Sequence, residues 1–317
     1  MDKLELVSRE RVEEDFAAAL AAGRLPDHFL YVGEGGADKW LALAASSDFD
    51  IAARLEGLLR GSLPELAPRL SGARDVVSLG AGAGRKERLI LEALAERGMR
   101  PSYFPIDIST RLIDLALAEV RSLAPEGCGL VAPIEALPRL ARCFHPPVLY
   151  CCLGNNACNY EPEWLLPLLR AQLKPADRLL LDLHVVPEDS DTARWETTRR
   201  YGCRLNRDFN LGPLLERGLP GDACELSLEV VASEGLGWRT RKEIRLTREA
   251  TLSCAGKDVQ LAAGTTLQMG FTYKYTAPSA LGLLISHGLA PQARFSSEGG
   301  DFLLLLLAPT RRATRQH

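Results

Sequence analysis

Residues 76–88, VVSLGAGAGRKER, constrain the fold of this chain more than any other segment. An apolar run typical of a buried strand leads into three glycines, and the glycines lead into a charged helical start at Arg85, Lys86 and Glu87. A strand, a glycine turn and a helix in this order are typical of α/β proteins that bind a ligand at the turn. The segment therefore predicts a ligand site at the carboxyl end of a buried strand.

The glycine spacing excludes two common phosphate-binding loops. The dinucleotide motif G-x-G-x-x-G, counted from Gly80, requires a third glycine at Arg85, and the phosphate loop G-x-x-x-x-G-K-[ST] fails because Glu87 follows Lys86. G-x-G-x-G after a first strand instead matches the loop of class I S-adenosylmethionine (SAM) enzymes. Asp107 ends the next predicted strand, where its carboxylate can accept hydrogen bonds from both ribose hydroxyls. Together these features predict that the chain binds SAM.

Strand and helix patterns alternate between residues 75 and 186. Strand patterns occupy residues 75–80, 102–107, 147–154 and 177–186. Helical patterns occupy residues 85–98, 110–123 and 161–174. Strands that alternate with helices pair in parallel through right-handed crossovers, so we expect a doubly wound, Rossmann-like α/β sheet. Pro105 is awkward inside a central strand, and we expect it near a strand end.

The chain divides into four predicted regions. Residues 1–60 form an N-terminal helical segment that opens with an amphipathic helix over 8–22, and residues 61–190 form the SAM-binding α/β core. Residues 191–275 alternate polar and apolar side chains with turn signals between them, which predicts an inserted antiparallel β lobe on the substrate side. Residues 276–317 return through a helix and a strand that complete the core.

Composition excludes several classes of partner. The net charge is −3 and the isoelectric point is near 6.0, which gives no reason to expect nucleic acid or an anionic membrane as partner. Without a signal-peptide pattern or an apolar run of membrane-spanning length, a cytoplasmic protein is expected. The eight cysteines contain no C-x-x-C pair and the five histidines no H-E-x-x-H, so we expect reduced cysteines and no metal site. A small-molecule substrate is expected, and the oligomeric state stays open.

Four segments of the chain resemble the histidine-specific methyltransferase family in their order and spacing. They are LGAGAGRKERLILEAL, YFPIDIS, CCLGNNACNYEP and DRLLLDLHVVPED. The resemblance extends from about Tyr31 to Asp189 and continues more weakly through GTTLQMGFTYKY and the last strand. It implies the class I methyltransferase fold, SAM as cofactor, and methyl transfer to an amine such as that of an amino acid.

The same resemblance implies two sets of site residues. The expected cofactor-binding residues are Tyr31, Gly80, Ala81, Gly82, Lys86, Asp107, Ile108, Ile134 and Gly154. The expected substrate-binding residues are Gly154, Asn155, Asn156, Asn159, Tyr201 and Thr272, of which Asn159 and Tyr201 are the expected catalytic residues.

Plainer interpretations of these residues stay open. Asparagines after a buried strand are often turn residues. Tyr31, Trp40 and Tyr201 are equally compatible with ordinary aromatic packing, and Trp238 and residues 273–275 are expected in the surface packing of the β lobe.

Departures from the family pattern occur on both the cofactor side and the substrate side. Ser78 replaces an Asp near the cofactor's ammonium group, Pro133 replaces an acidic residue near the adenine, and His184 replaces an acidic residue at a strand end. Gly270 aligns with the Glu that binds imidazole in the family, and Thr272 aligns with its neighbouring Ser. We therefore expect a substrate other than histidine. His184 is either a core residue or a base.

Three hypotheses about function follow. The first is a SAM-dependent methyltransferase that acts on the amine of a small polar metabolite by in-line displacement, a reaction that requires alignment and exclusion of water more than an acid–base pair. The second is transfer of the aminocarboxypropyl group of SAM, or cyclisation of SAM to azetidine-2-carboxylate, with release of methylthioadenosine. The third is a SAM-binding protein without catalytic activity.

Overall fold

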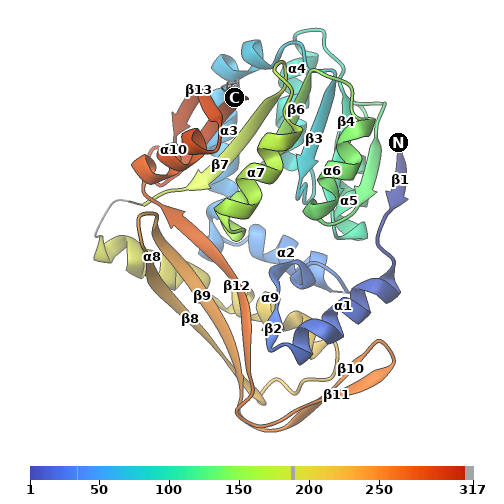
Figure 1. The fold of residues 1–317 in the computed structure, drawn as a ribbon, viewed down its shortest axis with the longest axis vertical. Coiled ribbons are helices and arrows are strands. Elements are labelled where there is room, and N and C mark those ends of the chain that lie inside the picture. Colours follow the sequence, from blue (N-terminus) through green and yellow to red (C-terminus); the bar gives the residue numbers. More distant parts are fainter. Residues whose placement is uncertain (34, 187–189, 311–317) are drawn as a thin grey trace, which may run out of the picture.

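The computed structural model describes residues 1–33, 35–186 and 190–310. An α/β core forms one part of the molecule, and a lobe of long strands and helices faces the carboxyl ends of the parallel strands of the core (Figure 1). None of the described helices combines the length and the apolar character needed to cross a membrane.

The core is built on a mixed sheet in which eight of the described strands pair in the order β1-β5-β4-β3-β6-β7-β14-β13. These strands are β1 (Asp2–Glu5), β3 (Asp75–Leu79), β4 (Ser102–Asp107), β5 (Cys128–Val131), β6 (Val148–Cys152), β7 (Arg178–His184), β13 (Leu289–Ser296) and β14 (Phe302–Pro309). Among these strands β14 runs antiparallel to both of its neighbours, β7 and β13, and the other pairings are parallel. Because β3 pairs with both β4 and β6, the strand order reverses at β3, and ligands bind at such a switch point.

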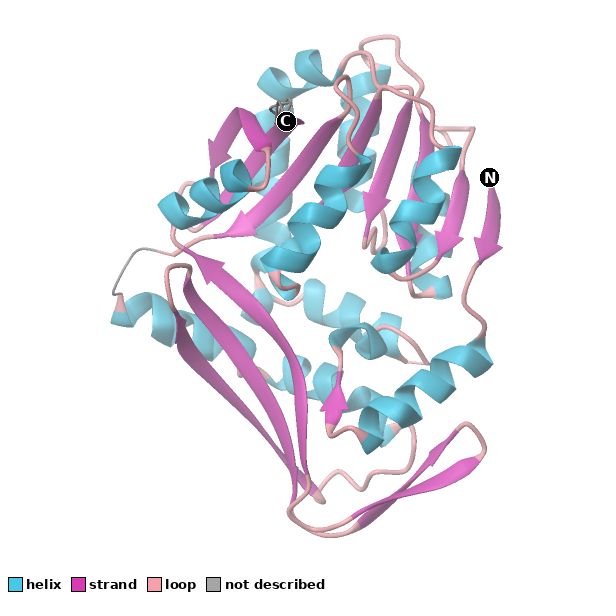
Figure 2. Cartoon of the chain, viewed as in Figure 1, coloured by secondary structure: helices cyan, strands magenta, loops and turns pink. Residues whose placement is uncertain are grey.

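Helices cover both faces of the sheet (Figure 2). One face packs against α3 (Ile51–Leu70), α4 (Arg85–Ala95) and α5 (Thr110–Val120), and the other against α6 (Leu137–Leu140), α7 (Pro162–Gln172) and α10 (Ala277–Ser286). Successive strand residues alternate between these faces: Cys151 joins the first helix layer and Cys152 the second, and both are free, buried cysteines. The expected doubly wound α/β fold is confirmed.

The lobe has a hydrophobic core of its own. Its strands are β2 (Arg24–Leu25), β8 (Cys224–Ser233), β9 (Gly237–Leu246), β10 (Ala250–Cys254), β11 (Lys257–Leu261) and β12 (Thr266–Tyr275). Its helices are α1 (Arg9–Ala21), α2 (Gly36–Ala44), α8 (Asp191–Tyr201) and α9 (Arg204–Leu215). Four strands form a sheet in the order β2-β12-β9-β8, and β10 and β11 form a separate hairpin. Apolar residues of α1, α9 and these strands pack together beneath this sheet.

Short 3-10 helices connect several of these elements. They are η1 (Asp27–Leu30), η2 (Ser47–Phe49), η3 (Ile134–Ala136), η4 (Ala141–Cys143) and η5 (Asn156–Asn159). Four of them, η1, η2, η3 and η5, carry residues of the cavity described below.

The N-terminal helix predicted over residues 8–22 is confirmed, and Ser8 caps it by accepting a hydrogen bond from Arg11 N at 3.2 Å. Strands β1, β5 and β13 were not expected, and α8 and α9 occupy the start of the region expected to be β-rich. The division into four regions stays a prediction, although α3 runs through the expected boundary at residue 60.

Pro105 lies inside β4 and not near its end, so that expectation was wrong. It is the fourth of six residues and faces Ser78 of β3. Residues 103 and 105 direct their nitrogens toward the same side, where Tyr103 N donates to Glu126 O. The ladder between β4 and β5 passes over Pro105 and resumes at Ile106 opposite Leu130. Because proline has no N–H, Pro105 contributes no hydrogen bond on this side of the strand.

Candidate functional site

A cavity of about 990 Å³ lies between the carboxyl ends of the parallel strands and the lobe. Ligand sites commonly occupy about 300–1,000 Å³, so this cavity has room for a cofactor and a small substrate together. Every residue expected at the site lines it: Tyr31, Gly80, Ala81, Gly82, Lys86, Asp107, Ile108, Ile134, Gly154, Asn155, Asn156, Asn159, Tyr201 and Thr272. Their individual roles stay predictions.

The glycine loop after β3 is held by close packing. Gly80 and Gly82 have φ of +64° and +54°, a left-handed conformation that favours glycine. A Cβ atom at Gly80 would overlap Nδ2 of Asn156, which donates to Leu79 O at 2.8 Å. Asn156 therefore closes over the turn, which gives it a structural role beside its place in the cavity wall.

Asp107 joins this loop to the end of β4. Its Oδ2 accepts from Gly82 N and its Oδ1 accepts from Ser109 N, both at 3.0 Å. Burial raises the pKa of Asp107 to about 6, and the backbone N–H groups oppose this shift. Its carboxylate is thus ionised at pH 7 and has lone pairs left for other donors. This donor–acceptor arrangement fits a ribose diol.

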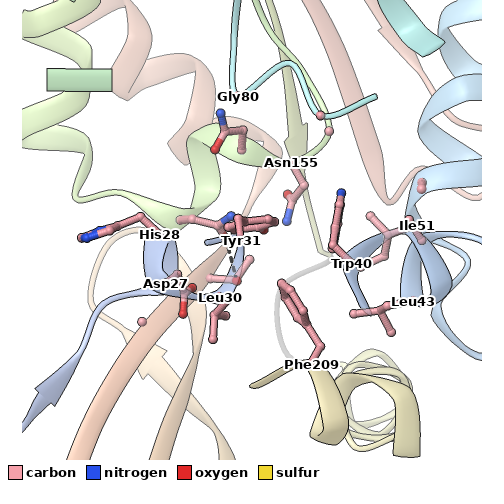
Figure 3. A pocket seen from close by; sticks show the side chains of 18 of the residues that line it. Asp27, His28, Leu30, Tyr31, Trp40, Leu43, Ile51, Gly80, Asn155 and Phe209 are labelled. Atoms are coloured by element: carbon pink, nitrogen blue, oxygen red, sulfur yellow. Dashed lines mark hydrogen bonds between the residues drawn. The ribbon is translucent and has the colours of Figure 1, made fainter. Parts of the chain in front are cut away.

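The turn after β6 is organised by an aspartate that the sequence analysis did not single out. Asp182 of β7 accepts from Gly154 N and Asn155 N, each at 2.6 Å. Burial raises the pKa of Asp182 to about 6, while these N–H groups and Lys86 lower it. The Oδ1 atom of Asn155 is buried without a partner among the described residues, and Asn155 lies in the cavity wall (Figure 3). It offers an acceptor for a donor group of a ligand.

Three elements bring the expected substrate residues together. Asn159 Oδ1 of η5 accepts from Thr272 Oγ1 of β12 at 2.8 Å. Tyr201 of α8 lines the same cavity, and its hydroxyl accepts from Lys274 Nζ at 2.8 Å. Burial raises the pKa of Tyr201, so its hydroxyl stays protonated at neutral pH.

Aromatic rings form one wall of the cavity (Figure 3). Tyr31 lies edge-on to Trp40 and to Phe209, with ring centroids 5.6 Å and 5.3 Å away, and Trp40 and Phe209 are 5.7 Å apart. Tyr31 and Trp40 therefore pack against each other and also line the cavity. Phe209, which the sequence analysis missed, belongs to α9.

The lobe side of the cavity has a charged cluster that replaces the missing acid at Gly270. A Cβ atom at Gly270 would overlap the carboxylate of Asp27, which comes from η1. Asp27 Oδ1 accepts from Lys242 Nζ at 2.8 Å, and Lys242 also donates to Asn210 Oδ1 at 3.0 Å. All of these residues line the cavity. A carboxylate is therefore present beside Gly270, but it is paired with a lysine.

The position of Lys242 in the sequence could have indicated that it has a partner inside the protein. It occupies the buried phase of β9, between Thr240 and Ile244. A lysine in the apolar phase of an alternating strand requires a partner inside the protein. No local sequence pattern could have placed Asp27 in the cavity, because its position there depends on the pairing of β2 with β12.

Three of the departures from the family pattern acquire a structural account. Ser78 donates to Glu87 Oε1 at 2.7 Å in the core, and neither residue lines the cavity. The family pattern has Asp at position 78 and Ser or Thr at position 87, so in this chain the acidic and the hydroxyl residue have exchanged positions. Pro133 lines the cavity. His184 does not line it: its ring packs 4.6 Å from that of Phe302, and burial together with nearby cations holds its pKa well below its usual value.

The expectation of surface packing for residues 238 and 273–275 was wrong. Trp238 is buried beneath Arg194, whose guanidinium lies 4.7 Å from the ring centroid, and Tyr273, Lys274 and Tyr275 are all buried. The alternation of β12 breaks at Gly270 and Phe271, where its register shifts, and residues 272–275 are all buried because the strand there runs between the lobe and the core.

Comparison with known proteins gives the same family that the motifs indicate. The sequence model of one family, described as histidine-specific, SAM-dependent methyltransferase, matches residues 11–193. The chain is similar to histidine N-alpha-methyltransferases from Mycolicibacterium smegmatis, with 24% identity over 84% of this chain and 88% of the relative, and from Mycobacterium tuberculosis, with 25% identity over 79% and 80%. Among solved structures it is similar to a magnesium protoporphyrin IX methyltransferase from Synechocystis with bound SAM, with 12% identity, 90% and 98% coverage and a TM-score of 0.47.

Proposed function

Because the chain belongs to the family of histidine-specific, SAM-dependent methyltransferases, we propose that it methylates the amine of an amino acid or a closely related small polar metabolite. The observation that carries this proposal is the shared cavity, in which the Asp107 carboxylate and the hydrogen-bonded pair Asn159–Thr272 both lie. A cofactor and an amine substrate can therefore meet in one enclosed space.

The residues on the core side fit SAM. Asp107 would accept from its ribose hydroxyls, the loop at residues 80–84 would contact its methionine part, and Ile108 and Ile134 would flank its base. Asn155 Oδ1 would accept from one of its N–H groups. When bound, SAM supplies an electrophilic methyl group and leaves as S-adenosylhomocysteine.

The residues on the lobe side fit an amino acid. Gly154 permits close approach of a ligand to the backbone, and the amide of Asn159 retains N–H donors because its oxygen is engaged by Thr272. These groups suit a carboxylate or an amine without adding net charge. The aromatic wall of Tyr31, Trp40 and Phe209 would exclude water from the reacting groups.

The cluster of Asp27, Lys242 and Asn210 favours one class of side chain. Its ion pair cancels in charge, while Asp27 Oδ2 can still accept and Lys242 has a third N–H to donate. A neutral group that both donates and accepts, such as a carboxamide or an imidazole, would be bound better than a charged one. We expected a substrate other than histidine because Gly270 replaces the acidic residue that binds imidazole in the family. Asp27 places a carboxylate beside Gly270, so that reason for excluding histidine is weaker.

The test is a panel in which the purified protein is incubated with methyl-labelled SAM and each of the twenty proteinogenic amino acids. Mass spectrometry should detect a methylated amine and one S-adenosylhomocysteine for each methyl group transferred, with neutral polar amino acids turned over fastest. Reactions without an amino acid are the control. Methylthioadenosine as the nucleoside product would contradict methyl transfer, and SAM binding without any product would contradict catalysis on amino acids.

A further inference from the structure

Lys274 on β12 is a fully buried lysine, with 0% of its surface exposed. Its Nζ lies 2.8 Å from the hydroxyl oxygen of Tyr201. Within the described part of the chain no carboxylate forms an ion pair with it. An ammonium group in such a place keeps only part of the solvation that it has in water, which favours the neutral amine.

The ring of Tyr201, whose centroid lies 4.7 Å from Nζ, attracts the ammonium form of Lys274, but the titratable groups around it do not restore its charge. Arg200 of α8, which pairs with Asp50 at 2.7 Å, disfavours a second cation nearby. Cys158 of η5 is a buried thiol whose pKa is raised to about 12, so it stays neutral, and His184 of β7 is neutral as well. Burial, aided by Arg200, lowers the pKa of Lys274 to about 7.

Tyr201 connects this lysine to the cavity. It lines the cavity wall with Asn159 and Thr272, and Lys274 lies behind it, outside the lining. A neutral amine at Lys274 can accept the hydroxyl proton of Tyr201, which frees the phenolic oxygen to take a proton from a group in the cavity.

We propose that Tyr201 and Lys274 together form the proton acceptor for the substrate's ammonium group. This inference rests on the amine methylation proposed above. One proton leaves the substrate nitrogen for Tyr201 Oη while the hydroxyl proton of Tyr201 moves to Lys274 Nζ, so that the substrate amine becomes a nucleophile. Lys274 returns its proton by the reverse path, through Tyr201 to solvent, when the product leaves.

The first test is the pH dependence of kcat/KM for the amino acid with the highest rate in the panel, measured as S-adenosylhomocysteine formation at saturating SAM. The wild-type profile should rise to a plateau with a midpoint near pH 7, about tenfold below the plateau at pH 6. Lys274→Met should remove this midpoint and lower kcat/KM at pH 7 by about 10²–10⁴-fold, with recovery as the pH rises toward the pKa of the free substrate. Tyr201→Phe should do the same.

Tyr275→Phe is the matched control, because it also removes a buried hydroxyl from this region but does not line the cavity. Its profile should equal that of the wild type. A Lys274→Met or Tyr201→Phe variant that binds SAM and keeps the wild-type midpoint overturns the inference and leaves the proposed methylation standing. A panel with no methylated amino acid overturns both.

A second measurement uses the wild-type protein without substrate, so it does not depend on whether a variant folds. In the ¹³C-labelled wild-type protein, the Cε resonance of Lys274 should titrate with a midpoint near pH 7. A resonance that stays at the chemical shift of a charged lysine up to pH 9 overturns the inference.

Discussion

Replacing Gly80 by alanine tests how tightly the cofactor loop is packed. Gly80 and Gly82 share a left-handed backbone, which costs an L-residue about 1–2 kcal/mol. Their surroundings differ: a Cβ at Gly80 would overlap the amide of Asn156, whereas at Gly82 the nearest heavy atom is Trp40 Nε1 at 4.0 Å. Gly82→Ala therefore measures the backbone cost alone, and Gly80→Ala adds the cost of displacing Asn156.

The added cost follows from one hydrogen bond. To admit the new Cβ, the Asn156 amide must leave Leu79 O, and a broken hydrogen bond costs about 0.5–1.5 kcal/mol, or more if the carbonyl stays buried without a partner. We expect Gly82→Ala to lower the free energy of unfolding by about 1–2 kcal/mol and Gly80→Ala by about 2–4 kcal/mol.

Urea unfolding without SAM, followed by circular dichroism, measures both values, provided that the slope with denaturant is unchanged. The double variant Gly80→Ala/Asn156→Ala sharpens the test. Once Gly80→Ala has displaced the Asn156 amide, removing that amide should lower the free energy of unfolding little further. The double variant should therefore lose clearly less stability than the sum of the losses in the two single variants. Equal losses at Gly80 and Gly82, or strict additivity in the double variant, would refute the packing argument.

Four further predictions concern binding and turnover. Asp107→Ala should weaken SAM binding by about 10–150-fold by calorimetry, since a hydrogen bond to a charged group contributes about 1.5–3 kcal/mol. Because the pKa of Asp107 is raised to about 6, wild-type SAM affinity should fall as the pH drops below 6, and the affinity of Asp107→Asn should fall less over the same range. Asn159→Ala should lower kcat/KM for the best amino acid by about 5–150-fold without changing SAM affinity; joint loss of both would make it a turn residue. Lys242→Met leaves Asp27 unpaired, so the ratio of kcat/KM for lysine to that for glutamine should rise at least about tenfold; an unchanged ratio would place the substrate side chain elsewhere.

The core could be predicted from the sequence because its signals are local. The glycine loop, the acid at the end of β4 and the alternation of strands and helices each occupy a short segment, and their order is enough to place the switch point. The motif residues consequently meet in one cavity, as expected. β1, β5 and β13 were missed because β1 and β5 have only four residues each and β13 mixes polar and apolar side chains.

The substrate side could be predicted only in part, because it depends on contacts between distant segments. Asp27 meets Gly270 only once β2 has paired with β12, and no local pattern encodes that pairing. Buried polar residues gave signals that the sequence analysis did not use. Asp182 stands alone in the apolar run of β7, and Lys242 and Lys274 occupy buried strand positions. A charged residue in such a position indicates a partner inside the fold.

The pairing of β2 with β12 also bears on how the protein is synthesised. Arg24 of β2 lies opposite Gln268 of β12, about 240 residues later in the chain. At a translation rate of about 5–20 residues per second, β2 leaves the ribosome roughly 12–50 s before its partner. The parallel strands β3 to β7, which carry the cofactor loop, are all made within that interval. The nascent chain can therefore assemble its cofactor half first, whereas Asp27 reaches its place beside Gly270 only after β12 has been made.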